Sequence, residues 1–202
     1  ARLGSLKEDL AFSLAIGVNA EVIVNNEVSA QLKERYPYKV ILTLRGDNSI
    51  DSLFVFDGVP VVWDGITIPN CQITHSPKFA FNRNFFGAQL MHRFNFILNY
   101  SADQGDNLYI QPGKDFEQQR AMPIISVFGL NVGEREQGII VHRLEPDGIA
   151  EKAGIALGDV VLELDGRAPK ASLTSQDFIR YTADKKEIRL RIKGKGEMRL
   201  AL

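Results

Sequence analysis

The stretch from Gly138 to Gly166, GIIVHRLEPDGIAEKAGIALGDVVLELDG, constrains the fold of this chain more than any other. Its apolar run at 139–141 predicts a strand. Pro146-Asp147-Gly148 predicts a turn, because proline fixes φ and glycine can take a positive φ. Asp147 is also placed to cap a short helix, which Gly154 would end in the left-handed conformation.

The second half of this stretch predicts a strand and a hairpin. Apolar residues alternate from Val160 to Leu164, as in a half-buried strand. Asp165-Gly166 is a dipeptide that suits a tight hairpin turn. Strand, turn, short helix, strand and hairpin therefore follow one another within a few tens of residues.

This order and spacing resembles the PDZ domain family. The matching positions are Gly138, Val141, Pro146, Gly148, Ala150, Ala153-Gly154-Ile155, Gly158-Asp159 and Asp165-Gly166. The resemblance implies an α+β domain, a small β-barrel capped by two helices. We place it at 120–202, with the boundary near Gln119 at the end of a polar, turn-rich segment.

The resemblance also implies a peptide-binding groove between a sheet edge and a helix. In the family, backbone N–H groups of an apolar-Gly-apolar loop bind a C-terminal carboxylate. The N–H groups of Phe128, Gly129 and Leu130 match these donors, and Gly129 permits the turn that aims them at one anion. The implied groove residues are Val127, Phe128, Gly129, Leu130, Asn131, Val132, Ser175, Ile179 and Thr182.

The far wall of this groove falls on a helix predicted over 172–181, with Thr174 or Ser175 as its N-cap. Many family members have histidine where this chain has Ser175, so the class of peptide stays open. Ile179 fits either the groove or the core.

Composition excludes several functional classes. The chain has 24 basic and 25 acidic residues, which argues against a nucleic-acid-binding protein. No apolar run approaches the ~18–20 residues that span a bilayer. The single cysteine, Cys71, cannot form an internal disulfide and is expected in the core. The three histidines lack metal-ligand spacing and no phosphate-binding glycine motif occurs, so we expect no metal and no cofactor.

The first 119 residues carry mostly strand patterns. A helix is predicted from Val28 to Tyr36, where Pro37 ends it. Asp57-Gly58 and Asp64-Gly65 both lie between alternating apolar segments and are predicted as hairpin turns. The fold class is therefore mainly β for the whole chain.

Residues 8–115 resemble a retropepsin-like aspartyl peptidase lobe, which implies a closed β-barrel with short helices over 1–119. Phe85-Phe86-Gly87 precedes a short helix, and a strand then ends near Asn99-Tyr100, in the order of that family. ITIPNCQI resembles an upstream strand of the same lobe. The resemblance also places the family's flap at Arg45 to Ser49, where an exposed hairpin tip is an equal alternative. Gly87 is expected where one backbone approaches another closely.

The catalytic triplet of that family is missing. Gly17, Val18 and Asn19 stand where Asp, Thr or Ser, and Gly are expected. Glycine has no acid or base, and the amide of Asn19 does not titrate in the working range. Since no Asp-Thr-Gly or Asp-Ser-Gly occurs in the chain, no catalytic residue is identified.

Two functions remain open. The chain is either a peptide- or protein-binding protein with a degenerate lobe, or the C-terminal part of an aspartic endopeptidase. In the second case the catalytic Asp would lie upstream of Ala1 or in a partner lobe, and a homodimer through this lobe is a candidate assembly. A third option is an unrelated β-barrel beside the PDZ-like domain. The start at Ala1 suggests a processed or truncated product. The pairing of domains favours an extracytoplasmic compartment, periplasmic or secreted, although a lone cysteine also fits the cytosol.

Overall fold

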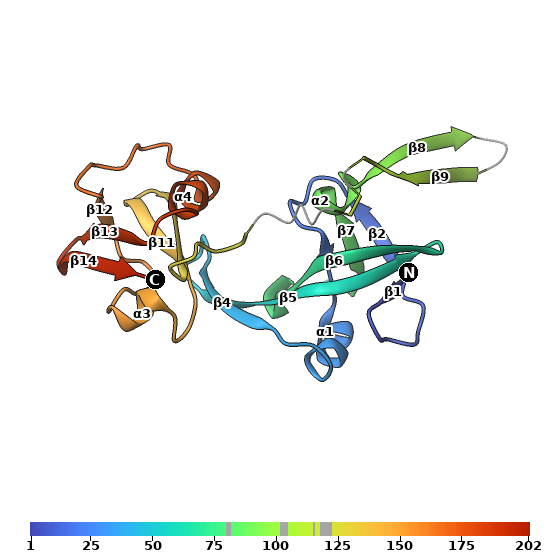
Figure 1. Cartoon of the computed structure of the whole chain (residues 1–202), viewed down its shortest axis with the longest axis horizontal. Helices are drawn as coiled ribbons and strands as arrows, with labels where there is room; N and C mark the ends of the chain where they lie inside the picture. Colours follow the sequence, from blue (N-terminus) through green and yellow to red (C-terminus); the bar gives the residue numbers. More distant parts are fainter. Residues whose placement is uncertain (80–81, 102–104, 115, 118–122) are drawn as a thin grey trace. The chain divides into compact units, whose positions relative to one another are not determined.

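The computed structural model describes residues 1–79, 82–101, 105–114, 116–117 and 123–202 (Figure 1). The chain is mainly β and divides into two compact units. The first comprises Ala1–Tyr38 with Phe54–Met122, and the second Lys39–Leu53 with Pro123–Leu202. The domain boundary predicted near Gln119 lies outside the described residues. Separate domains at 1–119 and 120–202 therefore stay a prediction.

The first unit is built on a mixed sheet. Its strands run in the order β5-β6-β3-β7-β2, with β1 pairing β5. Parallel pairs join β2 to β7 and β3 to β6, whereas β3 and β7 are antiparallel. The bounds are β1 Arg2–Leu3, β2 Phe12–Ala15, β3 Val22–Ile23, β5 Ile50–Trp63, β6 Ile66–His75, β7 Asn84–Gly87, β8 Phe94–Ser101, β9 Gly105–Pro112, α1 Asn26–Lys33, η1 Pro77–Phe79 and α2 Ala88–Met91.

Strands β8 and β9 form a separate two-stranded ribbon (Figure 1). Within the described part of the chain no closed barrel is found, so the closed retropepsin-like barrel is not confirmed. The core of this unit is aromatic: the rings of Phe12 and Phe86 stack with centroids 4.1 Å apart, and Trp63 packs on Phe86. Cys71 is fully buried, as predicted.

A buried ion pair lies within this core. The guanidinium of Arg93 donates to Glu21, and both side chains are inaccessible to solvent. Arg93 also donates to the Pro69 carbonyl at 2.7 Å, and the Gln72 N–H donates to Glu21 at 2.6 Å. These additional hydrogen bonds are what a buried pair needs to offset the loss of hydration.

One of the two predicted hairpins is wrong. Asp57-Gly58 lies inside the continuous strand β5, where the register with β6 shifts between Phe56 and Val59. Gly58 takes a φ of +74° in this bulge, and Asp57 accepts a hydrogen bond from Gln72 at 3.0 Å. A G1-type bulge uses the same left-handed glycine as a hairpin, which explains the error. Asp64-Gly65 does form the predicted turn between β5 and β6.

The second unit contains the β10-β11-β4 part of the large mixed sheet and a separate three-stranded sheet in the order β12-β13-β14. Helix α3 packs against β14 and helix α4 against β10. The bounds are β4 Lys39–Leu44, β10 Leu130–Arg135, β11 Gly138–Leu144, α3 Ile149–Lys152, β12 Val161–Leu164, α4 Ser175–Thr182, β13 Glu187–Ile192 and β14 Gly196–Ala201. The core includes Phe128, Phe178 and Leu190, all fully buried.

A hairpin from the N-terminal half of the sequence extends the first of these sheets. Thr43 of β4 pairs with Arg143 of β11, and Leu42 pairs with Leu144. On its other side β11 pairs these same residues with Asn131 and Leu130 of β10. The tip of this hairpin, at 46–48, is exposed and closed by a hydrogen bond from Arg45 N–H to the Ser49 carbonyl.

The turns and caps of the second unit mostly follow the sequence. Thr174, one of the two predicted N-caps, caps α4 and forms a capping box with Asp177. Asp165-Gly166 forms the predicted tight turn, with both residues at positive φ. Gly154 ends α3 at a φ of +88°. The predicted cap at Asp147 is wrong: this residue takes a φ of +56°, and Gly148 is the N-cap of α3 without a side-chain bond.

Candidate functional site

The loop at the expected catalytic triplet is tied to β7 and α2. The Val18 carbonyl accepts from Ala88 N–H at 2.9 Å, and the Ala20 carbonyl accepts from Gln89 N–H at 3.1 Å. A Cβ on Gly87 would lie 2.2 Å from the Ala20 carbonyl oxygen, so the close backbone approach predicted at Gly87 is confirmed. Asn19 accepts from the Gln89 side chain at 2.8 Å.

This loop supplies no free carboxylate. Gly17 faces open space, and the acid that follows the loop, Glu21, is held by Arg93 and the Gln72 N–H. The described residues contain no group of three or more His, Cys, Asp and Glu side chains that could hold a metal ion. Among them there is also no helix long and apolar enough to cross a membrane.

The two elements predicted as the walls of a peptide groove, β10 and α4, lie side by side. In the described part of the chain β10 pairs only with β11, so its other edge is open. Helix α4 packs against this strand. An open strand edge beside a helix is the arrangement to which an extended peptide can add as a further strand.

The loop Val127–Leu130, which leads into β10, forms a hydrogen-bonded turn. Gly129, at a φ of +75°, donates its N–H to the Ser126 carbonyl at 3.0 Å. Ser126 in turn donates through its hydroxyl to the Leu130 carbonyl at 2.6 Å. The Phe128 carbonyl accepts from Ala150 at the start of α3. One of the three predicted carboxylate donors, the N–H of Gly129, is therefore engaged within the loop.

The next two predicted residues are buried and stabilise the strand. Asn131 is fully buried; its side chain accepts from the Val132 N–H at 2.9 Å and donates to the Ile124 carbonyl. Arg143 donates to the same carbonyl at 2.9 Å. The side chain of Val132 also lies in the core, and its N–H is engaged by Asn131, so a ligand can meet only the other backbone groups of these two residues.

On the helical wall, Ser175 meets a residue that the sequence did not indicate. Its hydroxyl lies 2.6 Å from Nε2 of His142, which reaches across from β11. A Cβ on Gly133 would lie 3.4 Å from the Ser175 oxygen and 3.3 Å from the imidazole. Gly133, His142 and Ser175 thus converge at the start of α4. Gly133 pairs with Ile140, two residues from His142, so their approach follows from the strand register and no local sequence signal marks it.

Burial, and to a lesser extent the nearby positive charges of Arg143 and Arg135, lower the pKa of His142 to about 4. The imidazole is therefore neutral near pH 7 and presents no positive charge to the groove. A hydroxyl bonded to a neutral imidazole keeps at least one acceptor lone pair for a third group.

The two remaining predicted residues of α4 lie deeper. Ile179 is buried on the same helix face as Ser175, and Thr182 is fully buried. The Thr182 hydroxyl donates to the carbonyls of Phe178 and Ile179 at 2.8 and 3.0 Å. Its hydrogen-bonding capacity is therefore directed into the helix, not toward a ligand.

A comparison with protein families matches residues 117–201 to the family described as PDZ domain. This part of the chain is a PDZ domain. The strand edge, the loop at Val127–Leu130 and α4 all lie inside the matched range. No family is shown for the residues before it, so the retropepsin-like lobe is not supported by this finding.

A comparison with curated proteins finds the "Probable periplasmic serine endoprotease DegP-like" protein of Halomonas elongata, 33% identical over 66 residues. The match covers 33% of this chain and 14% of that protein. The relative links the chain to a protein named as a protease. The compact unit that contains the PDZ domain is larger than the matched range, because it includes the hairpin Lys39–Leu53.

Proposed function

We propose that this chain is a protease-associated, peptide-binding protein whose PDZ domain captures the C-terminal segments of peptides or proteins. The open edge of β10 beside α4, with the loop Val127–Leu130 at its start, is the observation that carries the proposal. The family match and the relative named as an endoprotease support it.

In this proposal the peptide pairs with β10, and its carboxylate lies at the N–H groups of Phe128, Gly129 and Leu130. The Gly129 N–H must first exchange its bond to the Ser126 carbonyl for one to the carboxylate. A charge-assisted bond to a carboxylate is stronger than a neutral one, so the exchange is favourable. Side-chain preference then depends on Ser175 and Ile179, together with His142.

Fluorescence polarisation with a labelled C-terminal peptide tests this proposal. The same peptide with an amidated C-terminus should bind at least about tenfold more weakly, because one charge-assisted interaction is lost. Gly129→Ala should weaken binding, whereas Gly166→Ala serves as its control. Both glycines have nearly the same positive φ, 75° and 76°, but only Gly129 lies in the loop. Equal affinity for the free acid and the amide would contradict carboxylate capture.

For the first unit we propose a degenerate retropepsin-like lobe that serves as a scaffold. The close approach of Gly87 to the Gly17–Ala20 loop and the order of its elements support this assignment. The second candidate function is an aspartic endopeptidase that obtains its Asp from an upstream segment or from a partner lobe, as in a homodimer. Pepstatin-sensitive cleavage of an unfolded protein at acidic pH, with the oligomeric state from sedimentation, separates the two. A scaffold shows no such cleavage.

We also propose an extracytoplasmic location, periplasmic or secreted. The relative is named as periplasmic, which supports the proposal for this chain. Fractionation of cells that express the full-length protein, followed by detection with an antibody to the PDZ domain, checks it. Recovery with a cytosolic marker enzyme would contradict the proposal.

A further inference from the structure

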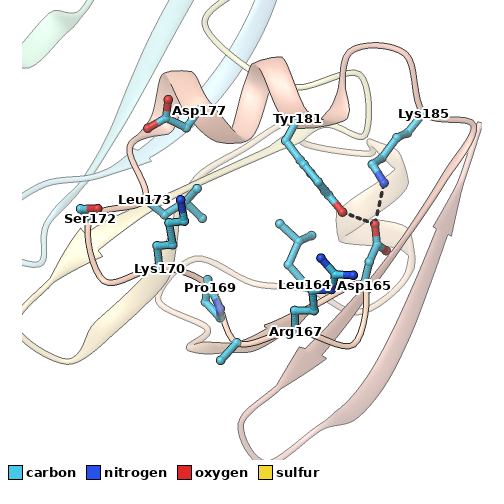
Figure 2. A pocket seen from close by; sticks show the side chains of 11 residues that line it. Leu164, Asp165, Arg167, Pro169, Lys170, Ser172, Leu173, Asp177, Tyr181 and Lys185 are labelled. Atoms are coloured by element: carbon cyan, nitrogen blue, oxygen red, sulfur yellow. Dashed lines mark hydrogen bonds and ion pairs between the residues drawn. The ribbon is translucent and has the colours of Figure 1, made fainter.

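A pocket of about 730 Å³ lies within the second unit (Figure 2), and none of the residues predicted for the peptide groove lines it. It is formed by the end of β12, the loop 165–173 and one side of α4. Its apolar lining comes from Leu164, Pro169 and Leu173. This volume and mixed lining fall within the range of sites that hold small ligands, ~300–1,000 Å³.

The pocket and the groove use different faces of α4. Successive helical residues are rotated by about 100°, which places Asp177 and Tyr181 roughly opposite Ser175 and Ile179. Asp177 and Tyr181 line the pocket, and in Figure 2 the Tyr181 side chain extends from the helix toward Asp165. A ligand can therefore occupy the pocket without entering the groove.

One wall of the pocket is a fixed polar network. Asp165 accepts from the Tyr181 hydroxyl at 2.6 Å, from Lys185 at 2.8 Å and from the Arg189 N–H at 2.7 Å. Partial burial raises the pKa of Asp165, but these hydrogen bonds outweigh it and lower the pKa, so the carboxylate is ionised. Lys185 also lies 4.2 Å from the centroid of the Tyr181 ring. The charges of Asp165 and Lys185 therefore neutralise each other.

The loop on the other side is also held in place. Asp177 is engaged by the capping box with Thr174, and Arg180 lies 3.7 Å from its carboxylate. A hydrogen bond from Leu173 N–H to the Lys170 carbonyl at 3.0 Å closes a turn in the loop. The pocket is thus largely formed before any ligand arrives, which reduces the entropic cost of binding.

Two further cations line the pocket, Arg167 and Lys170, and they lack the ion pair that Lys185 forms with Asp165. Both are exposed, and in the part of the chain described neither forms an ion pair with an acidic side chain. The lining as a whole has three cations and two carboxylates. Hydrogen bonds from Thr174, and to a lesser extent the charges of Arg180 and Lys170, lower the pKa of Asp177. With Asp165 neutralised by Lys185, the lining keeps a net positive charge.

We propose that this pocket binds an apolar group that carries a carboxylate, with Leu164, Pro169 and Leu173 against the apolar part and Arg167 and Lys170 at the anion. A guanidinium offers a planar fork that matches a carboxylate with two hydrogen bonds, whereas Lys170 adds a point charge. A cationic ligand would instead meet uncompensated positive charge. Such a carboxylate can come from a fatty acid or from an acidic residue beside a leucine in a protein segment.

The proposal is tested on the full chain by ¹H–¹⁵N NMR titration. Decanoate should shift the amide signals of 164–173 and Tyr181, and decanol, which has the same chain without the charge, should bind about tenfold more weakly. Acetyl-Leu-Glu-Leu-amide tests the protein-segment source, because its amidated end lacks the terminal carboxylate needed in the groove. Binding of this peptide alone, or of decanoate alone, identifies the source.

The double variant Arg167→Gln/Lys170→Gln should weaken decanoate binding by about tenfold. Lys152→Gln is the control, since Lys152 is an exposed cation on α3 that does not line the pocket. Equal binding of decanoate and decanol, or unchanged decanoate binding by the double variant, would overturn the proposal. Binding of a free C-terminal peptide is measured in parallel from the amide signals of Phe128 to Val132. Loss of ligand binding in the pocket is therefore distinguished from loss of peptide binding in the groove.

Discussion

His142 meets Ser175 at the start of α4, and the burial of its imidazole makes the stability of the second unit depend on pH. Burial holds the pKa of His142 at about 4 in the folded chain, against an ordinary value of 6.5. The neutral imidazole therefore contributes its full stabilisation above pH ~6.5, and this is lost progressively as pH falls toward ~4, because only the unfolded chain takes up the proton. The loss is at most about 3 kcal/mol.

Urea unfolding at several pH values, followed through the amide signals of β11, measures this effect. His142→Gln should remove most of the fall in unfolding free energy between pH ~6.5 and ~4. His92→Gln is the control, because His92 is exposed and lies in the first unit. A pH profile that is unchanged in His142→Gln would show that another group causes the dependence.

Among single residues, the sequence indicated Ser175 as a site residue, but it did not indicate His142, Glu21 or Arg93. Ser175 was indicated by the resemblance to the PDZ family, together with a local helix-start signal in which Thr174 or Ser175 could be the N-cap. His142 and Ser175 lie 33 positions apart in the sequence, and Glu21 and Arg93 lie 72 apart. Pairs of this kind follow from strand register and packing, which no local pattern specifies.

Among the elements, strand β4 is the one whose partner was not expected. It pairs with β11, which pairs in turn with β10, the strand that follows the loop Val127–Leu130. Turn chemistry is local, which is why Asp64-Gly65 and Asp165-Gly166 were predicted correctly. Asp57-Gly58 has the same chemistry inside a bulge, and the choice between bulge and hairpin depends on β6.

Because β4 completes this sheet, Thr43→Pro should destabilise the second unit. Proline removes one backbone donor and disfavours the strand at a position paired with Arg143, at a cost of about 1–3 kcal/mol. Hydrogen exchange at the β11 amides of Arg143 and Leu144 should accelerate at least about fivefold. Asn48→Gly at the exposed tip is the control, since Asn48 has a φ of +62° that glycine adopts freely. Unchanged exchange in Thr43→Pro would show that β4 adds nothing to the sheet.

For the whole molecule, the boundary between the two units falls inside one strand. Residues 50–53 of β5 belong to the second unit and residues 54–63 to the first. The predicted division into 1–119 and 120–202 does not include such a shared strand, because it assigns the hairpin at 39–53 to the first domain. A continuous strand transmits unfolding more directly than a flexible linker does, so the units are expected to unfold cooperatively.

A C-terminal peptide that binds the groove tests this cooperativity. At a free concentration of about 100 times its Kd it stabilises the second unit by about 2.7 kcal/mol. Trp63, the single tryptophan, lies in the first unit, so its fluorescence reports unfolding there. If the units are coupled, the peptide raises the urea midpoint seen by Trp63 together with that seen by the amides of β11. Inserting Gly-Ser-Gly-Ser between Leu53 and Phe54 should remove the shift at Trp63 alone, whereas the same insertion between Gly46 and Asp47, at the exposed tip, should leave it intact. If the peptide does not change the urea midpoint seen by Trp63 in the unaltered chain, the units unfold independently in spite of the shared strand.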